Sequence, residues 1–260
     1  MTNPLQIIGR VTLSLFAEIG RLSVFAGRVA TAAVTPRWYM GEIVRQMVRI
    51  GFYSLPVVGL SAVFIGAALA LNIYEGGSRY GAEQFVPNIV VLGISRELGA
   101  VITGLMLAGR VSAGIAAEIG AMRVTEQIDA LETLSASPDR YLYAPRFLAA
   151  VATLPLLVVA ANIIGVMGGW LVSVYGLGFD STVYLRNTVD FVTRDDILVG
   201  LIKAVLFGGI IAVMGCYQGD RSQAGATGVG RAATLSMVGA AVLVLAFNYV
   251  LSALFVEIGL

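Results

Sequence analysis

Long hydrophobic runs, separated by short polar segments, dominate the chain after residue 50. Five runs are long enough to cross a bilayer as helices, because a hydrocarbon core of about 30 Å needs roughly 20 apolar residues. We predict membrane helices over residues 50–74, 84–112, 147–176, 197–219 and 232–256. The third uncharged run is longer than one span needs. We therefore expect its helix to tilt, to kink near Pro155, or to continue into the next loop.

The segment before these runs has a different pattern. Over residues 4–35, apolar side chains recur at helical spacing and most arginines fall on the other side, which is typical of an amphipathic helix in the membrane interface. The apolar positions are Ile8, Val11, Leu15, Ile19, Leu22, Phe25 or Ala26, and Val29. Thr35 and Pro36 end the pattern. The segment is too long and too charged for a signal peptide.

A charged island, residues 118–146, separates the second and third hydrophobic runs. Its apolar residues at helical spacing are Val124, Ile128, Leu131 and Leu134, and the other side carries Arg123, Glu126, Asp129 and Glu132. This period predicts a helix over residues 120–136. Such a helix is too short and too charged to span a bilayer. Two interpretations stay open: it presents a face to a partner in water, or it lies on the lipid headgroups.

Composition places the whole chain in a membrane. Of its residues, 58% are hydrophobic and 13% are charged, and the mean hydropathy is +0.86, whereas soluble domains contain about 25% charged residues. We predict an all-α integral membrane protein forming a single domain over residues 1–260, with no separate soluble domain. Histidine is absent and the one cysteine, Cys216, lies in an apolar run. Intrachain disulfides and imidazole metal sites are therefore excluded.

Basic residues are distributed unevenly over the connecting segments. If the N-terminus lies in the cytoplasm and the chain changes sides at each span, most arginines fall on the cytoplasmic side. These are Arg10, Arg21, Arg28, Arg37, Arg45, Arg49, Arg110, Arg123, Arg140, Arg146, Arg221 and Arg231, and the opposite side holds only Arg79, Arg186 and Arg194. Because cytoplasmic loops carry an excess of Lys and Arg, we predict a cytoplasmic N-terminus, a cytosolic charged island and a C-terminus on the outer side.

Three charged residues interrupt the hydrophobic runs. Arg96 and Glu97 lie about twelve residues from either end of their run, where a charge costs at least about 2.5–3.5 kcal/mol. Adjacent helical residues point about 100° apart, so we expect each to need its own partner, in a substrate path or in an ion pair to another helix. Lys203, the only lysine, lies about one turn inside the fourth run, and its position favours snorkelling to the interface. Asn248 is interpreted as an interhelical contact.

One glycine-rich stretch needs to be excluded as a nucleotide site. Residues 225–231 read GATGVGR, similar to a Walker A loop, but arginine replaces the phosphate-binding lysine and Ala232 replaces the magnesium-binding hydroxyl. We therefore expect this chain to contain no ATPase site.

The block SRELGAVITGLMLAGRVSAGIAAEIGAMRVTEQIDALETLSASPDRYLYAPRFLA, residues 95–149, resembles the signature of the MlaE (YrbE/Ttg2B/TGD1-like) permeases. These are membrane subunits of ABC systems that move phospholipids between membranes. The amphipathic helix before it, and GVGRAAT with a last span after it, fit the same plan. Two positions depart from the family: Ala100 stands where proline is usual, and Asn248 where many members have an acid.

The resemblance implies a function and a set of partners. It implies a multi-pass homodimer in the bacterial inner membrane, with a periplasmic C-terminus, a cytosolic ABC ATPase subunit that binds ATP and magnesium, a periplasmic ring of MCE-domain proteins and, in many such systems, a small STAS-domain subunit. We expect no cofactor in this chain and no nucleic-acid partner.

The resemblance also implies roles for particular residues. The charged island would be a coupling helix that contacts the ATPase through Arg123, Glu126, Gln127, Asp129, Leu131 and Glu132. The phospholipid path would involve Arg96, Glu97, Tyr80, Leu69 and Lys203.

Two other functions are consistent with the residues alone. An ion-coupled secondary transporter would use Arg96, Glu97 and Lys203 and would need no ATPase. A membrane-embedded lipid enzyme would use acids near the outer surface, namely Asp190, Asp195 and Asp196, although no nucleophile or metal constellation supports it.

Overall fold

The computed structural model of the protein describes residues 4–35 and 38–259, without the side chains of residues 4–8, 11 and 15. These residues form helices and connecting turns and contain no strand. The α-helices are α1 Pro4–Val34, α2 Met40–Ile50, α3 Leu55–Ser78, α4 Val86–Gly93, α5 Gly99–Leu107, α6 Ala113–Val124, α7 Gln127–Thr133, α8 Ala144–Leu177, α9 Ser181–Phe191, α10 Arg194–Asp220 and α11 Ala226–Ile258.

Short non-α turns join several of these helices into longer rods. They are the 3₁₀ turns η1 Phe52–Ser54 and η2 Glu83–Phe85 and the π-helical turns η3 Ile94–Leu98, η4 Ala108–Ser112 and η5 Asp139–Tyr143. The described residues then contain five apolar rods long enough to cross a membrane: Met40–Ser78, Glu83–Val124, Asp139–Leu177, Arg194–Asp220 and Ala226–Ile258. Each includes one predicted span, which confirms the all-α membrane fold.

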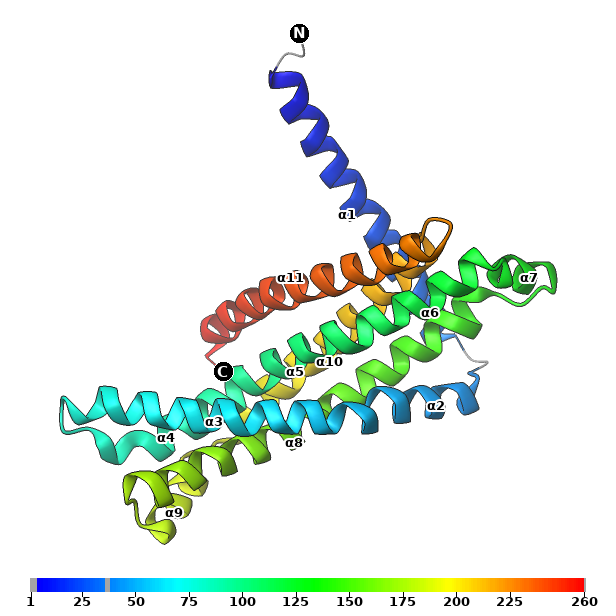
Figure 1. The fold of residues 1–260 in the computed structure, drawn as a ribbon. Helices are drawn as coiled ribbons and strands as arrows, with labels where there is room; N and C mark the ends of the chain where they lie inside the picture. Colours follow the sequence, from blue (N-terminus) through cyan, green and yellow to red (C-terminus); the bar gives the residue numbers. More distant parts are fainter. Residues whose placement is uncertain (1–3, 36–37, 260) are drawn as a thin grey trace.

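The five rods lie side by side in a bundle, with α7 at one end and α9 at the other (Figure 1). Helix α8 packs along α3 and α10, and α10 also packs along α6 and α11. Small residues allow these approaches, as is usual between membrane helices. A Cβ atom on Gly66 of α3 would lie 1.8 Å from the carbonyl oxygen of Gly165 on α8, so only glycine fits there.

The long third run forms one helix that continues past the length of a simple span. Helix α8 has 34 residues, which corresponds to about 51 Å, and it includes Pro155. It ends where Gly178 takes a left-handed conformation, with φ of 78°. Of the outcomes expected for this run, the structure shows continuation beyond a single span.

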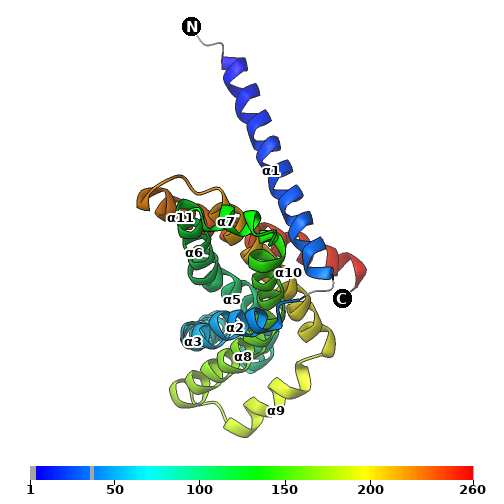
Figure 2. The same cartoon turned by 90° about the vertical axis from the view of Figure 1, so that its right-hand side faces the viewer.

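Helix α1 is attached to the bundle mainly by its second half, with Glu18 as the first contact. Phe25, Val29 and Ala33 are buried against the other helices, whereas Ile19 is 59% exposed. The first half projects away from the bundle (Figures 1 and 2). The predicted stripe therefore packs on the bundle only from Leu22 onwards. The side chains of Ile8, Val11 and Leu15, and all of Arg37, lie outside the described residues.

The prediction of a single helix over residues 120–136 is wrong. Helix α6 continues to Val124, the chain turns at Thr125 and Glu126, and α7 covers only Gln127–Thr133. Glu126 adopts a left-handed conformation with φ of 59°, which ends the α6 helix although the apolar period continues through it. Leu134 lies just past the end of α7 and is 77% exposed, so it does not share the buried side of Ile128.

Candidate functional site

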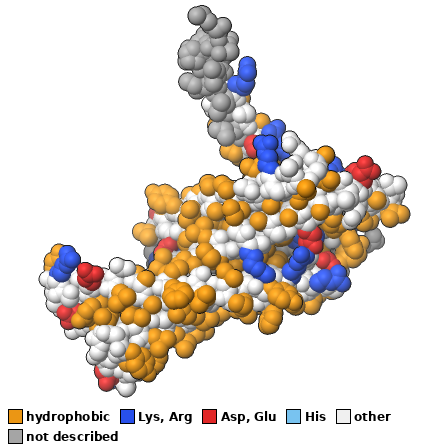
Figure 3. Space-filling view, in the orientation of Figure 1, with side chains coloured by type: hydrophobic (Ala, Val, Ile, Leu, Met, Phe, Trp, Pro, Cys, Tyr) orange, Lys and Arg blue, Asp and Glu red, His pale blue; other side chains and the backbone are white. Residues whose placement is uncertain are grey.

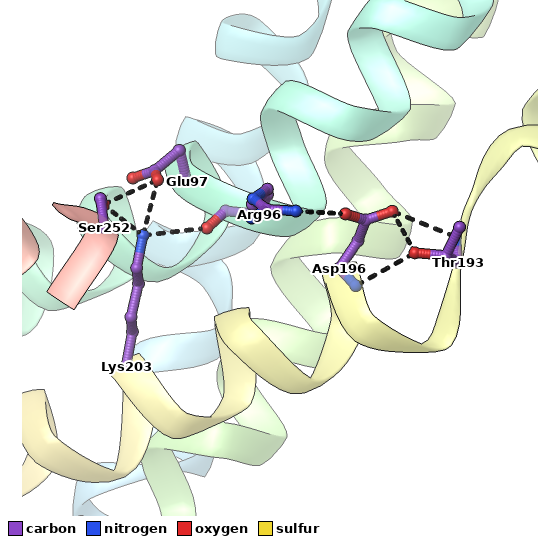
Figure 4. A network of polar contacts seen from close by, with 6 residues as sticks. All are labelled: Arg96, Glu97, Thr193, Asp196, Lys203 and Ser252. Atoms are coloured by element: carbon purple, nitrogen blue, oxygen red, sulfur yellow. Dashed lines mark hydrogen bonds and ion pairs between the residues drawn. The ribbon is translucent and has the colours of Figure 1, made fainter. Parts of the chain in front are cut away.

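The π-helical turn η3 places two charges inside the bundle. Arg96 and Glu97 both lie in this turn, between α4 and α5, and their side chains point in different directions (Figure 4). Arg96 faces the start of α10, and Glu97 faces the middle of α10 and the end of α11. The expectation that each needs its own partner is confirmed.

Asp196 at the start of α10 is the partner of Arg96. Nη1 of Arg96 lies 3.1 Å from Oδ1 of Asp196, whose side chain is 6% exposed. The other carboxylate oxygen of Asp196 accepts hydrogen bonds from the hydroxyl and the backbone N–H of Thr193. The Asp196 N–H in turn donates to the Thr193 hydroxyl. This reciprocal capping box begins α10 and fixes the carboxylate that Arg96 contacts.

Lys203 is the partner of Glu97. Its Nζ lies 2.7 Å from Oε1 of Glu97 and also donates to the Arg96 carbonyl and to the hydroxyl of Ser252. Ser252 donates to Glu97 Oε1 at 2.8 Å, and the amide of Asn248 donates to Oε2 at 3.1 Å. The turn η3 and helices α10 and α11 are thereby joined through one carboxylate, and the interhelical role predicted for Asn248 is confirmed.

Lys203 is fully buried in this network, with a side-chain exposure of 0%. The interpretation that it snorkels to the interface is therefore wrong. A lysine one turn inside a span reaches the interface when nothing inside competes for it. Here a carboxylate, a hydroxyl and a backbone carbonyl surround the ammonium group, so burial leaves no donor unsatisfied.

Close backbone packing holds the charged turn in place. A Cβ atom on Gly200 of α10 would lie 2.4 Å from the carbonyl oxygen of Ser95, so α10 can approach η3 only with glycine there. On the other side, a Cβ on Gly99 would lie 1.8 Å from Oδ1 of Asn162 of α8. The turn is thus confined between α8 and α10, and its two charges are directed towards fixed partners.

The corner between α6 and α7 forms a second group of predicted site residues. Nη1 of Arg123 lies 2.7 Å from Oδ1 of Asp129 and closes the corner. The buried side chain of Ile128 and the partly buried Leu131 attach α7 to the core. Glu126, Gln127, Asp129 and Glu132 are exposed. The corner therefore presents a mainly acidic surface on a short, anchored helix at the end of the bundle.

Comparison with known proteins identifies the family of this chain. The family model described as Permease MlaE matches residues 43–254. A probable ABC transporter permease protein of Rickettsia bellii is 47% identical over 258 residues, which cover 99% of this chain and 100% of that protein. The Haemophilus influenzae protein named intermembrane phospholipid transport system permease protein MlaE is 33% identical over 257 residues, covering 98% of each chain. The Arabidopsis thaliana protein trigalactosyldiacylglycerol 1, chloroplastic, is 32% identical over 234 residues, 90% of this chain and 67% of that protein.

The chain belongs to the MlaE permease family.

Membership confirms the resemblance drawn from residues 95–149. In this MlaE-family chain, the signature block contains η3 with its two charges, the glycine-rich α5 and α6, and the α6–α7 corner. With its five apolar rods, the chain is a multi-pass membrane permease subunit.

Two predicted path residues do not join the network. Leu69 on α3 packs against a separate apolar cluster that includes Ala70, Val90 and Tyr184. Tyr80 follows α3 in the turn before α4 and is 87% exposed. Of the five predicted path residues, the structure brings together Arg96, Glu97 and Lys203 only.

The sequence did not predict three residues to be members of the network. Asp196 was considered only as a surface acid, and Thr193 and Ser252 were not considered. The pattern Thr193-x-x-Asp196 before an apolar run is a capping-box signal that could have located the start of α10. No comparable signal marks Ser252. Its role depends on which face of α11 meets α5.

The acids of the lipid-enzyme alternative are not brought together in this structure. Asp190 lies 3.6 Å from Arg186 on the exposed α9, whereas Asp196 is buried in the network. The described residues contain no cluster of three acids or thiols that could hold a metal ion. Residues 225–231 form the start of α11 and the residue before it, and no strand precedes them within the described range.

Proposed function

We propose that this MlaE-family permease is the transmembrane subunit of an ABC transporter that moves phospholipids between the inner and outer membranes, driven by a separate ATPase subunit that binds ATP and magnesium. The observation that carries the proposal is the charge network of Arg96, Asp196, Glu97 and Lys203 inside otherwise apolar rods. Charges in membrane segments usually mark a substrate path. The Haemophilus relative, named for phospholipid transport, supports a lipid substrate.

The charges of the network match a phospholipid headgroup. Two cations and two carboxylates are paired with one another, so the network is electrically balanced. A headgroup phosphate can replace a carboxylate beside Arg96 or Lys203, and the amine of a zwitterionic lipid can then pair with the carboxylate that is released. The acyl chains remain on apolar helix surfaces. Partial exposure of Arg96 and Glu97, at 27% and 38%, leaves the network accessible to such a headgroup.

The α6–α7 corner is the proposed contact with the ATPase. Its exposed acids, Glu126, Asp129 and Glu132, lie on a helix anchored by Ile128, so a displacement of the corner acts on α6. This assignment places the α7 end of the bundle and the N-terminus in the cytoplasm, and α9 and the C-terminus in the periplasm of a bacterial inner membrane. The excess of arginines on the α7 side supports the same orientation.

The family resemblance supplies the remaining partners of the proposal. Two copies of the chain would enclose the lipid path, a periplasmic ring of MCE-domain proteins would exchange lipid with it, and a STAS-domain subunit would assist in systems that contain one. Leu69 and Tyr80, which lie outside the network, are proposed to line the outer mouth of the path near the MCE ring.

Reconstitution tests the proposal against its main rival. The chain is placed in proteoliposomes with fluorescent phospholipid, with and without an ABC ATPase subunit and an MCE-domain protein from the same organism. We expect ATP-dependent lipid transfer with the partners and none with the chain alone. An ion-coupled secondary transporter would instead move its substrate along an imposed ion gradient without the ATPase, and that result would overturn the proposal.

A further inference from the structure

A polar cavity lies between α2, η4 and α6, away from the charge network. Its volume is about 180 Å³. The polar lining residues are Gln46, Arg49, Arg110 and Glu118, and the apolar ones include Ile50 and Ile115. A single buried water needs only about 10–15 Å³, so the cavity has room for a larger polar group. Arg110 lies about four helical turns, or roughly 20 Å, from Arg96 along the same rod.

The charges around this cavity do not balance. Glu118 is held by Arg49 at 2.6 Å and, from behind, by Arg146 at 3.1 Å, whose side chain is 4% exposed. Arg110 projects from the π-helical turn η4 and donates to the hydroxyl of Ser54. Within the described part of the chain no carboxylate lies at ion-pair distance from Arg110. Three arginines thus surround one acid, and the two that line the cavity have donors to offer an anion.

The surface of the molecule shows the same concentration of charge. Basic side chains, with acidic ones among them, are grouped around the cavity towards the α7 end, and hydrophobic side chains cover the face along α3 (Figure 3). Exposed aromatic residues lie before and after the part of α2 that lines the cavity. They are Trp38, Tyr39, Phe52 and Tyr53. Trp and Tyr concentrate at the level of lipid headgroups, so the cavity lies where phosphate groups are abundant.

We propose that this cavity binds a phosphate oxyanion, supplied by a phospholipid headgroup of the surrounding leaflet, through Arg49 and Arg110. Guanidinium groups pair with phosphate oxygens through two parallel hydrogen bonds, which an ammonium group does not reproduce. Ile50 and Ile115 provide an apolar wall for the first carbons of the lipid. The site is separate from the proposed transport path, and its occupation requires no ATPase.

Two independent changes test the site without disturbing the core. Arg110→Gln removes one cation whose only contact recorded in the structure is a hydroxyl. Its control, Arg45→Gln, removes an exposed cation that pairs with the partly buried Glu42 on α2, outside the cavity lining. Gly114 also lines the cavity, and a Cβ there meets nothing within 4 Å. Gly114→Phe therefore fills the cavity, whereas its control, Gly114→Ala, leaves it open.

The measurement is native mass spectrometry of the full chain in detergent, titrated with phosphatidylglycerol or with diacylglycerol of the same acyl chains. We expect the unchanged chain to bind one phosphatidylglycerol at this site. In Arg110→Gln and in Gly114→Phe, the affinity for that lipid should fall at least about tenfold. Both controls should stay within about twofold of the unchanged chain, since exposed charges contribute little. Diacylglycerol should not be retained at this site.

Inorganic phosphate distinguishes the two sources of the oxyanion. Displacement of the lipid by millimolar phosphate would show that the site takes phosphate from either source, and failure to displace it would identify the headgroup with its glycerol as the ligand. The proposal is overturned if Arg110→Gln and Gly114→Phe retain phosphatidylglycerol as the unchanged chain does, or if diacylglycerol is retained equally.

Discussion

At the scale of single residues, the network depends on opposite charges that are separated along the chain. Glu97 has its counter-charge 106 positions later, at Lys203, and accepts further hydrogen bonds from Ser252 and Asn248. Taking two charges out of water is costly, and attraction between them offsets that cost only with good geometry. Removing one partner of such a pair is therefore expected to lower the free energy of unfolding more than removing both.

Lys203→Met tests this dependence. It leaves Glu97 without its cation, and we expect a loss of about 3 kcal/mol in the free energy of unfolding, the lower end of the range for buried pairs because Glu97 is partly exposed. The double variant Lys203→Met/Glu97→Gln should recover most of that loss. Unfolding in mixed micelles measures stability, and lipid transfer measures function. Equal stability of the single and double variants would contradict the coupling.

Gly200 gives a second prediction at this scale. An alanine in a helix is normally more stable than glycine by about 0.5–1 kcal/mol. At Gly200 the added methyl would lie 2.4 Å from the Ser95 carbonyl, so α10 must move away from η3 and the Lys203 contacts must lengthen. We expect Gly200→Ala to lower the thermal midpoint. Gly76→Ala, where the methyl meets nothing within 4 Å, should not lower it.

These residues show how much of the site could be predicted from the sequence. The separate partners of Arg96 and Glu97 followed from the angular spacing of a helix and could be anticipated. The burial of Lys203 could not, because it depends on the rotation of α10 relative to α5, and an almost uniformly apolar helix does not encode that rotation in its pattern.

At the scale of elements, one left-handed residue decides the shape of the proposed coupling region. Apolar residues at Val124, Ile128 and Leu131 keep a helical period across the corner, because α6 and α7 both bury one side. The period therefore predicted one helix where two exist. The π-helical turns were missed for a similar reason, since one extra residue in a turn hardly changes an apolar pattern.

Substitutions at Glu126 separate the geometry of this corner from its charge. Glycine adopts positive φ freely, so Glu126→Gly should keep the corner and stability while removing the charge. Glu126→Lys should keep the fold but abolish co-purification of the ATPase, because it reverses the charge on the proposed contact. Glu83→Lys, an exposed acid near the opposite end of the bundle, is the matched control. If the Glu126→Lys variant still co-purifies with the ATPase, Glu126 is not part of the contact.

At the scale of the whole molecule, five spans could be counted from hydropathy, but their arrangement could not be derived from it. Helix α8 is apolar on every side, so its pattern does not show which face meets α3 and which meets α10. Backbone contacts at small residues select the faces: Gly66 meets the Gly165 carbonyl, and a Cβ on Gly208 would lie 2.7 Å from the Ala150 carbonyl. At these glycine positions, the close approach of two backbones determines which faces of the helices meet.

The attachment of α1 to this bundle contains a titratable contact outside the spans. Glu18 accepts hydrogen bonds from the Tyr217 hydroxyl at 2.6 Å and from Arg21 and Arg221. The Tyr217 hydroxyl, followed by the Arg21 guanidinium, lowers the pKa of the Glu18 carboxyl below its ordinary value of about 4.3. Because the folded pKa is the lower one, this stabilisation is complete above the ordinary value and is lost as pH falls through the folded pKa.

We therefore expect α1 to loosen from α10 in acid and to stay attached at neutral pH. Spin labels on α1 and α11 should report a broader distance distribution as pH falls from 7 to below about 4. Phe25 and Val29 are buried and carry no titrating group, so we expect the second half of α1 to loosen without detaching. Glu18→Gln removes the titrating group, and its distribution should be broader already at pH 7 and insensitive to acid. A normal acid transition in that variant would assign the change to another group.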